Sequence, residues 1–228
     1  SDPLGLYHAE MGSDAIVGGI TRSGVSGSYT YTVKAGFANK PVTSVSFYDS
    51  LRFSNWLNNG QGSGDTETGA YTLLGGTIFP SNGLSVTRNI GANIVLPSDN
   101  EWFKAAYYSG AGGVYFDYPT GTNSVTGCVA PGSDTGNSAN CNYAVVAATD
   151  VGAYLLSDSP YGTYDQGGNV WEWNEEIVYG SSRGIRGGSW NNYASILAAS
   201  SPNLNGPANE SRYVGFRVAS PIPEPGTG

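Results

Sequence analysis

The sequence has few of the residue types on which most catalytic sites depend. It contains a single histidine, His8, near the N-terminus. A site built from three histidines for iron or zinc is therefore excluded within this chain, and a Ser-His-Asp or Cys-His arrangement would have to use His8. A run of about 18 consecutive apolar residues is also absent, so no segment is typical of a transmembrane helix.

Charge is scarce as well, and positive charge most of all. Only 12% of the residues are charged, and 10 Lys and Arg stand against 18 Asp and Glu, a net charge of −8. So few cations cannot neutralise many phosphates, which disfavours nucleic acids and anionic membrane surfaces as partners. Acidic chains of this kind are suited to divalent cations.

What the sequence does contain indicates one folded domain with many loops. It has 34 glycines, 16 tyrosines and 39% hydrophobic residues in a chain of 228. Disordered segments are usually highly charged and poor in aromatics, unlike this sequence. We place the domain at residues 1–219. Residues 220–228, which include the prolines of PIPEPGTG, are expected to form an exposed linker.

Cys128 and Cys141 flank a stretch of small and polar residues. In an oxidising compartment this spacing allows a disulfide, which would stabilise the fold by about 3 kcal/mol. The alternative is two unpaired small side chains. Residues 110–165 are expected to be mostly loop, a length that requires something to tie it down.

Two helices and several short strands are predicted. Ser46 with Asp49, and Ser98 with Glu101, have the spacing of helix N-caps, and Gly60 stands where the first helix should end. An apolar stripe of Phe53, Trp56 and Leu57 predicts the packed face of that first helix. Strands are expected at 28–34, 167–178, 181–190 and 213–219 because apolar residues alternate or cluster there. Residues 1–27 are expected to be irregular, and the fold class is α+β.

The acidic segment YDQGGNVWEWNEE, residues 164–176, is the richest in chemistry. Asp165 and Glu172, together with carbonyls of the glycine turn, are the hard oxygen ligands that Ca²⁺ prefers. A tight turn before a strand, with the acids in water, is the simpler interpretation. A pair of carboxylates for glycoside hydrolysis, Glu172 with Glu175 or Glu176, is a further alternative.

Five motifs in order resemble the sulfatase-modifying factor, or formylglycine-generating, family. They are PVTSVSFYDSLRFSNWLN (41–58), LPSDNEWFKAAYY (96–108), GNVWEW (168–173), RGGSW (186–190) and GFRVA (215–219). The resemblance implies an irregular variant of the C-type lectin fold with two main helices, short antiparallel sheets and long loops. The family's N-terminal strand and helix have no counterpart in this sequence, so we expect another chain to cover the region around residues 1–30.

The resemblance also weighs against catalysis. Oxidising members of the family carry two copper-binding cysteines after this Gly-Gly-Ser motif, whereas this chain has Asn191, Asn192 and Leu197 there. Amides and alkyl groups cannot replace the soft ligands that Cu(I) requires. The histidine cluster of related iron enzymes is absent too. A divergent enzyme of the family, or a hydrolase that uses carboxylates, is kept as the alternative.

For calcium the resemblance is favourable. The family's structural site corresponds to Asp165, Gly168, Val170 and Glu172 in this chain, two side chains and two backbone carbonyls. A second site would fall on Asn142 and Tyr143, without an evident acidic partner.

The tail PIPEPGTG resembles the start of a PEP-CTERM sorting signal, which implies export by a Gram-negative bacterium to its surface or extracellular matrix.

The stretch after RGGSW is interpreted as a binding surface rather than an active site. Variable proteins that share this fold place their diversified residues before the Gly-Phe-Arg motif. The corresponding residues here are Trp190, Asn191, Asn192, Tyr193, Ser195, Asn203, Asn205 and Asn209. Such residues offer flat contact area and adaptable hydrogen bonds, although an ordinary polar loop would have the same composition. We therefore expect a secreted, non-catalytic domain that binds protein, polysaccharide or itself, with self-assembly as one possibility.

Overall fold

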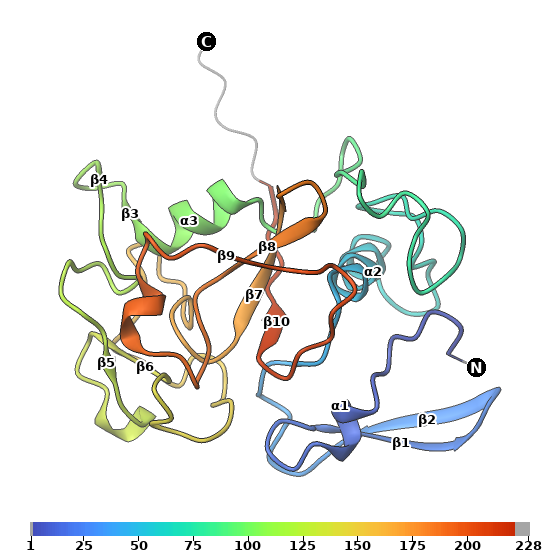
Figure 1. The fold of residues 1–228 in the computed structure, drawn as a ribbon, viewed down its shortest axis with the longest axis horizontal. Coiled ribbons are helices and arrows are strands. Elements are labelled where there is room, and N and C mark those ends of the chain that lie inside the picture. Colours follow the sequence, from blue (N-terminus) through green and yellow to red (C-terminus); the bar gives the residue numbers. More distant parts are fainter. Residues whose placement is uncertain (1, 222–228) are drawn as a thin grey trace.

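The computed structural model describes residues 2–221, and the elements follow one another along the chain as Figure 1 shows. The helices are α1 (Glu10–Ser13), α2 (Phe47–Asn58) and α3 (Asp99–Tyr107), with short 3-10 turns at Pro131–Ser133 and Ala194–Leu197. The strands are β1 (Ile20–Val25), β2 (Ser28–Val33), β3 (Tyr108–Ser109), β4 (Val114–Tyr115), β5 (Gly127–Cys128), β6 (Ser138–Ala139), β7 (Trp171–Val178), β8 (Ser182–Arg186), β9 (Asn203–Asn205) and β10 (Val214–Phe216). No helix within the described residues is long and apolar enough to cross a membrane.

A four-stranded sheet in the order β10-β7-β8-β9 forms the centre of the molecule. β7, β8 and β9 are antiparallel, whereas β10 runs parallel to β7 with Val214 opposite Trp171. Trp173 of β7 is fully buried and packs against Phe47 of α2, with ring centroids 6.0 Å apart. The predicted strands around GNVWEW, RGGSW and GFRVA therefore meet in one sheet. The expected α+β class is confirmed, although two of the strand pairs are parallel.

Both long helices begin where the sequence indicates. The Ser46 hydroxyl accepts the backbone N–H of Asp49, and Ser98 accepts that of Glu101, each with the reciprocal bond of a capping box. Gly60 follows α2 with a φ of 83°, a conformation that glycine adopts without strain. Local capping chemistry thus fixes the limits of the two helices.

The buried face of α2 differs from the predicted one. Phe53 is 40% exposed, while Phe47, Leu51 and Asn55 point into the core. The buried polar residues explain the difference: the side-chain N–H of Asn55 donates to the carbonyl of Thr66, and its oxygen accepts the N–H of Tyr71. A prediction from hydrophobicity alone misses a face that is anchored by amide hydrogen bonds.

The N-terminal segment is more regular than expected. β1 and β2 form an antiparallel hairpin in which Ile20 pairs with Val33, and Gly27 takes a positive φ at the turn. In Figure 1 this hairpin lies at one end of the long axis, and the small β3–β4 hairpin lies at the other. The expectation of an irregular segment at 1–27 was wrong because β1 alternates weakly and is recognisable only by its pairing with β2.

A disulfide joins Cys128 to Cys141 and spans the expected long loop. Its two cysteines belong to or follow β5 and β6, which pair in parallel. Cys141 is fully buried against Tyr118 and Leu197. Residues 110–165 are therefore mostly irregular, as expected, and are held by a covalent bond and a small apolar cluster. The linker that was predicted at 220–228 lies almost wholly outside the described residues.

Candidate functional site

A buried ion pair between Glu172 and Arg217 lies at the edge of the central sheet. Glu172 on β7 is 5% exposed, and its Oε2 accepts the indole N–H of Trp102 at 2.6 Å. Arg217, which follows β10, donates from Nη2 to Oε1 of Glu172 at 2.6 Å and from Nε to Oε2. The Glu172 carboxylate therefore links its own motif, GNVWEW, to GFRVA through Arg217 and to the motif of α3 through Trp102. The sequence did not reveal Arg217 and Trp102 as partners of Glu172, although both lie within motifs that resemble the family.

Asp165 lies beside this pair. Its Oδ2 accepts the backbone N–H of Gly152 at 2.6 Å, and the residue adopts a positive φ of 57°. Burial raises the pKa of the Asp165 carboxyl, an effect that the backbone hydrogen bond and Arg217 oppose. Asp165, Val170, Glu172 and Arg217 line one cavity of about 360 Å³.

Three residues of the first predicted calcium set, Asp165, Val170 and Glu172, line the same cavity, and Gly168 lies between them in the chain. Gly168 turns the chain with a φ of 76°, and a side chain there would meet the carbonyl oxygen of Asn140 at 2.3 Å. Within residues 2–221 no group of three His, Cys, Asp or Glu residues is placed to hold a metal, so a cation would depend on two carboxylates and backbone carbonyls. Such a donor set fits Ca²⁺ in kind. Arg217 already binds both oxygens of Glu172, so a calcium ion would have to share that carboxylate.

The second predicted calcium site is less well provided with ligands. Asn142 and Tyr143 both have positive φ, and their backbone N–H groups donate to the carbonyls of Asn192 and Trp190. Among the described residues, two nearby oxygens that the sequence did not single out have no hydrogen-bond partner although they are buried: Oδ1 of Asn140 and Oγ1 of Thr149. Asn169 connects them, because its N–H donates to the carbonyl of Asn140 and its Oδ1 accepts the N–H of Thr149.

The RGGSW turn is built by its own amides. The Ser189 hydroxyl donates to the side-chain oxygens of Asn191 and Asn192, and the backbone N–H of Ser189 also donates to Asn192. Gly187 has a φ of 95°, and a side chain there would lie 3.0 Å from the carbonyl oxygen of Gln166. The two asparagines that stand where oxidising relatives have cysteines therefore serve to fold the turn.

The predicted binding surface requires one correction. Trp190 is only 2% exposed and lies between Tyr143 and Tyr213, with centroids 5.6 and 5.2 Å away. Its ring cannot offer a face to a large ligand, because the adjoining turns cover it. Tyr193, by contrast, is 70% exposed.

The remaining surface residues fall into two places. Ser195 lies in the 3-10 turn that follows Tyr193. Asn203 and Asn205 belong to β9, the edge strand, and Asn209 donates from its side chain to Asn205. Of these four residues, Ser195, Asn203 and Asn209 are exposed, whereas Asn205 is half-buried.

The carboxylates proposed for hydrolysis do not form a pair. Glu172 is bound to Arg217, whereas Glu175 is bound to Arg88 at 2.8 Å, and Glu176 is exposed. A glycosidase needs two carboxyl groups that face one substrate. The two inward carboxylates have different arginine partners, which does not favour that alternative.

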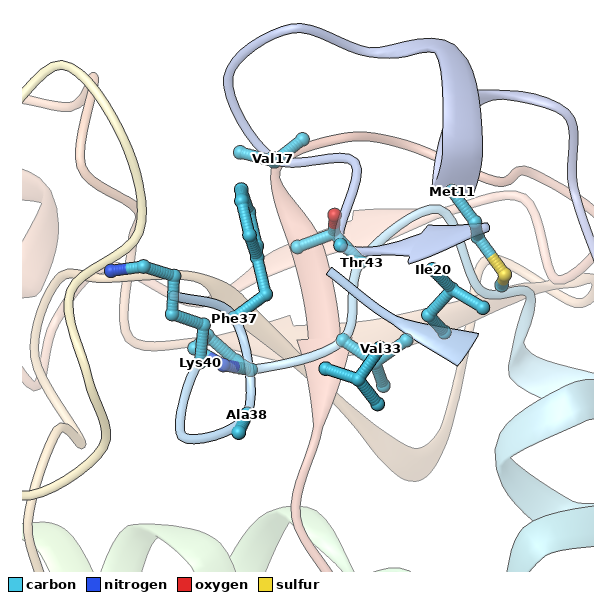
Figure 2. Close-up of a pocket in the computed structure, with 11 residues that line it drawn as sticks. Met11, Val17, Ile20, Val33, Phe37, Ala38, Lys40 and Thr43 are labelled. Carbon is cyan, nitrogen blue, oxygen red and sulfur yellow. The ribbon is translucent and has the colours of Figure 1, made fainter. Parts of the chain in front are cut away.

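Two apolar hollows adjoin the N-terminal hairpin. Figure 2 shows the smaller one, about 170 Å³, between Val17, Ile20, Val33 and Phe37, with Lys40 at its rim. A larger, open one of about 680 Å³ is lined by apolar side chains of α2, the hairpin and β10: Leu6, Met11, Ile20, Tyr31, Val42, Val45, Phe53, Trp56 and Phe216. The expectation that another chain covers this region stays a prediction.

Comparison with known proteins identifies the fold and the family. The family of sulfatase-modifying factor enzyme 1-like domains matches residues 15–222. Hercynine oxygenase of Mycobacterium tuberculosis is 32% identical over 143 residues, 54% of this chain and 32% of that protein. Hercynine oxygenase of Mycolicibacterium thermoresistibile is 29% identical over 147 residues, 54% of this chain and 31% of that protein. The aligned part thus spans about a third of each of these curated relatives.

Two solved structures share the fold. Treponema denticola variable protein 1 superposes with a TM-score of 0.61 at 23% identity, over 83% of this chain and 74% of that one. The crystal structure of CarF gives 0.62 at 22% identity, over 93% of this chain and 81% of that one. At these identities the likeness establishes the architecture alone. With the family match over residues 15–222, it leads to one conclusion: the chain belongs to the sulfatase-modifying factor enzyme 1-like domain family.

Proposed function

We propose that this chain is a non-catalytic binding domain that recognises a polysaccharide, another surface protein or further copies of itself. The observation that supports the proposal most is that the cysteines and the histidine, the side chains most often used in catalysis, are not arranged as a reactive site. Both cysteines are consumed in one disulfide, and His8 lies near the N-terminus with its Nε2 3.8 Å from Glu210. The turn after RGGSW offers amides and hydroxyls, which do not hold a redox metal of the copper or iron type.

We propose the cellular location of the protein from the sequence of its C-terminal tail and from its disulfide. Residues PIPEPGTG resemble a sorting signal, and a disulfide is stable in an oxidising compartment. Both features support export to the cell surface or extracellular matrix. The proposal is therefore of a domain that contacts its surroundings rather than one that transforms a metabolite.

Calcium is proposed as a structural ion of this domain. Asp165 and Glu172 would hold it with the carbonyls of Gly168 and Val170, and it would supply positive charge beside a carboxyl group whose pKa is raised by burial. The ion would tie the loop that carries Asp165 to the start of β7. Its removal is expected to lower stability without abolishing the fold.

An enzyme of the oxygenase type is the second candidate, because relatives named hercynine oxygenase share 32% and 29% identity over part of the chain. The test is to incubate the purified protein with hercynine, oxygen and either iron(II) or copper(I), and to follow hercynine by liquid chromatography. A peptide containing the Cys-x-Pro-x-Arg sequence is assayed in parallel for formylglycine. We expect no turnover above the protein-free control with either substrate; turnover that a heat-denatured sample lacks would overturn the proposal.

A further inference from the structure

A group of four aromatic rings, two of them exposed, lies at the end of the molecule opposite the N-terminal hairpin. It consists of Phe103 of α3, Tyr108 and Tyr115 of the β3–β4 hairpin, and Tyr161 of a later loop, and we call it the tyrosine platform. Ring centroids are 5.4 Å apart for Phe103 and Tyr115, 4.8 Å for Tyr108 and Tyr115, and 6.4 Å for Tyr108 and Tyr161. The end of α3 and the hairpin that follows it thus form one aromatic cluster with Tyr161, which comes from a distant loop.

The platform has half-buried and exposed members: Phe103 and Tyr108 are half-buried, and Phe103 packs against a buried cluster of α3. Tyr115 is 55% exposed and Tyr161 is 49% exposed, and Val114 beside them is 47% exposed. Tyr108 and Tyr161 are nearly parallel, with 27° between their planes. Grouped, solvent-facing aromatic side chains are uncommon on soluble proteins and mark a surface that binds something.

The rings are also held in place before any ligand arrives. Tyr108 and Tyr115 are opposite each other in the hairpin register, and the N–H of Phe116 donates to the carbonyl of Tyr107. The hydroxyl of Tyr161 lies over the turn, since a side chain at Gly110 would come within 3.7 Å of it. Rigid aromatic side chains lose little conformational entropy on binding, which favours their use as contact surfaces.

The chemistry of this surface selects its ligand. Each tyrosine carries a flat ring with a hydroxyl at its edge, and Tyr115 and Tyr161 are exposed to solvent. The electron-rich face of such a ring attracts the C–H groups on one face of a pyranose sugar, while the hydroxyl at the edge can bond the sugar's own hydroxyls. A purely apolar partner would leave these hydroxyls unsatisfied on docking.

The charge of the protein distinguishes between neutral and anionic glycans as ligands. The chain carries a net charge of −8, and two cations lie against rings of the platform. The guanidinium of Arg186 lies 5.1 Å from the ring of Phe103 and is neutralised by its ion pair with Asp99. The Nζ of Lys104 lies 5.9 Å from the ring of Tyr108. A polyanionic glycan would be repelled by this balance, whereas a neutral one is not. We infer that the tyrosine platform binds a neutral polysaccharide by stacking pyranose rings on Tyr115, Tyr108 and Tyr161. The inference rests on the proposed binding function and gives it a site and a ligand class.

The experiment is affinity electrophoresis of the native protein in gels that contain hydroxyethylcellulose, xylan, dextran or, as the anionic comparison, alginate. We expect retardation by at least one neutral glycan and none by alginate. Tyr115→Ala and Tyr161→Ala should each weaken binding about tenfold or more, the size expected when one stacking ring is removed. Tyr179→Ala is the matched control, because Tyr179 is 91% exposed on the β7–β8 turn and lies outside the platform; it should change binding less than about twofold.

The contrary outcomes are distinct. No retardation by any neutral glycan overturns the assignment of the platform, and it leaves the proposed binding function to be judged by self-association and protein binding. Retardation that Tyr115→Ala and Tyr161→Ala leave unchanged places the glycan elsewhere and also overturns the assignment. Self-association in sedimentation that only the platform variants lose identifies a protein-docking surface instead. Turnover of hercynine would remove the proposed function itself. Thermal unfolding of each variant checks that these exposed substitutions leave the fold intact.

Discussion

Two aromatic regions of this domain invite comparison, the turn at Trp190 and the tyrosine platform. Trp190 lies within a sequence motif, yet it is 2% exposed and is enclosed by Tyr143 and Tyr213. Tyr115 of the platform lies in a short hairpin without any motif, yet it is 55% exposed and in contact with Phe103 and Tyr108. Buried motif residues such as Trp190 thus belong to the internal framework, whereas the exposed rings Tyr115 and Tyr161 lie outside the motifs. The half-buried rings of the platform, Phe103 and Tyr108, stand within the motif at 96–108.

The strongest test of this comparison is Trp190→Ala. We expect a loss of about 3–5 kcal/mol in the free energy of unfolding, because a large buried ring leaves a cavity. Chemical denaturation measures it. The neighbouring Tyr193→Ala is the control, since Tyr193 is 70% exposed and its removal should cost less than about 0.5 kcal/mol. Equal free energies of unfolding for the two variants would show that Trp190 contributes no more to the core than the exposed Tyr193.

Glu172→Gln tests the ion pair that joins the motifs. The substitution keeps the shape and an acceptor for Trp102 but leaves Arg217 without its charge partner. Because Arg217 is partly exposed, with a side-chain accessibility of 26%, we expect a cost of about 2–4 kcal/mol, somewhat below that of a fully buried pair. Glu176→Gln, on the exposed end of the same strand, should be close to neutral. A neutral effect at Glu172 would show that packing alone holds the three motifs together.

Removal of the disulfide tests whether the stability of the loop at residues 128–141 and glycan binding by the platform are independent. Replacing both Cys128 and Cys141 by serine opens a link of 13 residues and should cost about 3 kcal/mol. Proteolysis should then cut first between residues 128 and 141. Retardation by neutral glycans should be unchanged below the unfolding temperature. Loss of glycan binding with the fold intact would mean that the platform depends on the disulfide loop.

The dependence of stability on calcium and on pH tests the role of Asp165 in the interior of the domain. Burial raises the pKa of the Asp165 carboxyl in the folded protein. Without calcium, the free energy of unfolding therefore falls as the pH rises from the ordinary carboxyl pKa, about 4, through the raised pKa, because the buried group then has to ionise. Asp165→Asn should remove that pH step. Calcium at about a hundredfold excess over its dissociation constant should stabilise the parent protein by about 2–3 kcal/mol and the variant far less. Thermal unfolding at several pH values, with calcium or with a chelator, measures both effects. An identical response of the two proteins would remove Asp165 from the calcium site.

The smallest expected effect is that of Tyr115→Ala on stability. Its ring is more than half exposed, so the free energy of unfolding should fall by less than about 1 kcal/mol even though binding is weakened. Denaturation curves and affinity electrophoresis on the same sample give both numbers. A large loss of stability would reassign the ring from the binding surface to the framework.

Local signals in the sequence predicted what local physics controls. The capping residues Ser46 and Ser98 were identified because each has its partner three residues away. The strands around GNVWEW were identified because apolar and aromatic residues cluster there. The partners of Glu172 were not found, since Trp102 and Arg217 are 70 and 45 residues away in the chain. The tyrosine platform was missed because nothing local in the sequence shows that Tyr161 lies beside Tyr108. The exposure of Trp190 was misjudged because polar neighbours suggest a surface even when they serve to fold the turn over a buried ring.

The parallel pairing of β10 with β7 has a consequence for how the chain acquires its structure. Val214 pairs with Trp171, Ala219 pairs with Val95, and the N–H of Ser44 donates to the carbonyl of Ser211. The two halves of the sheet therefore cannot close until residues near position 219 have left the ribosome. Contacts between such distant segments slow folding. Until β10 is available to pair with β7, the central sheet lacks an edge strand, so the chain keeps an open sheet edge through most of its synthesis.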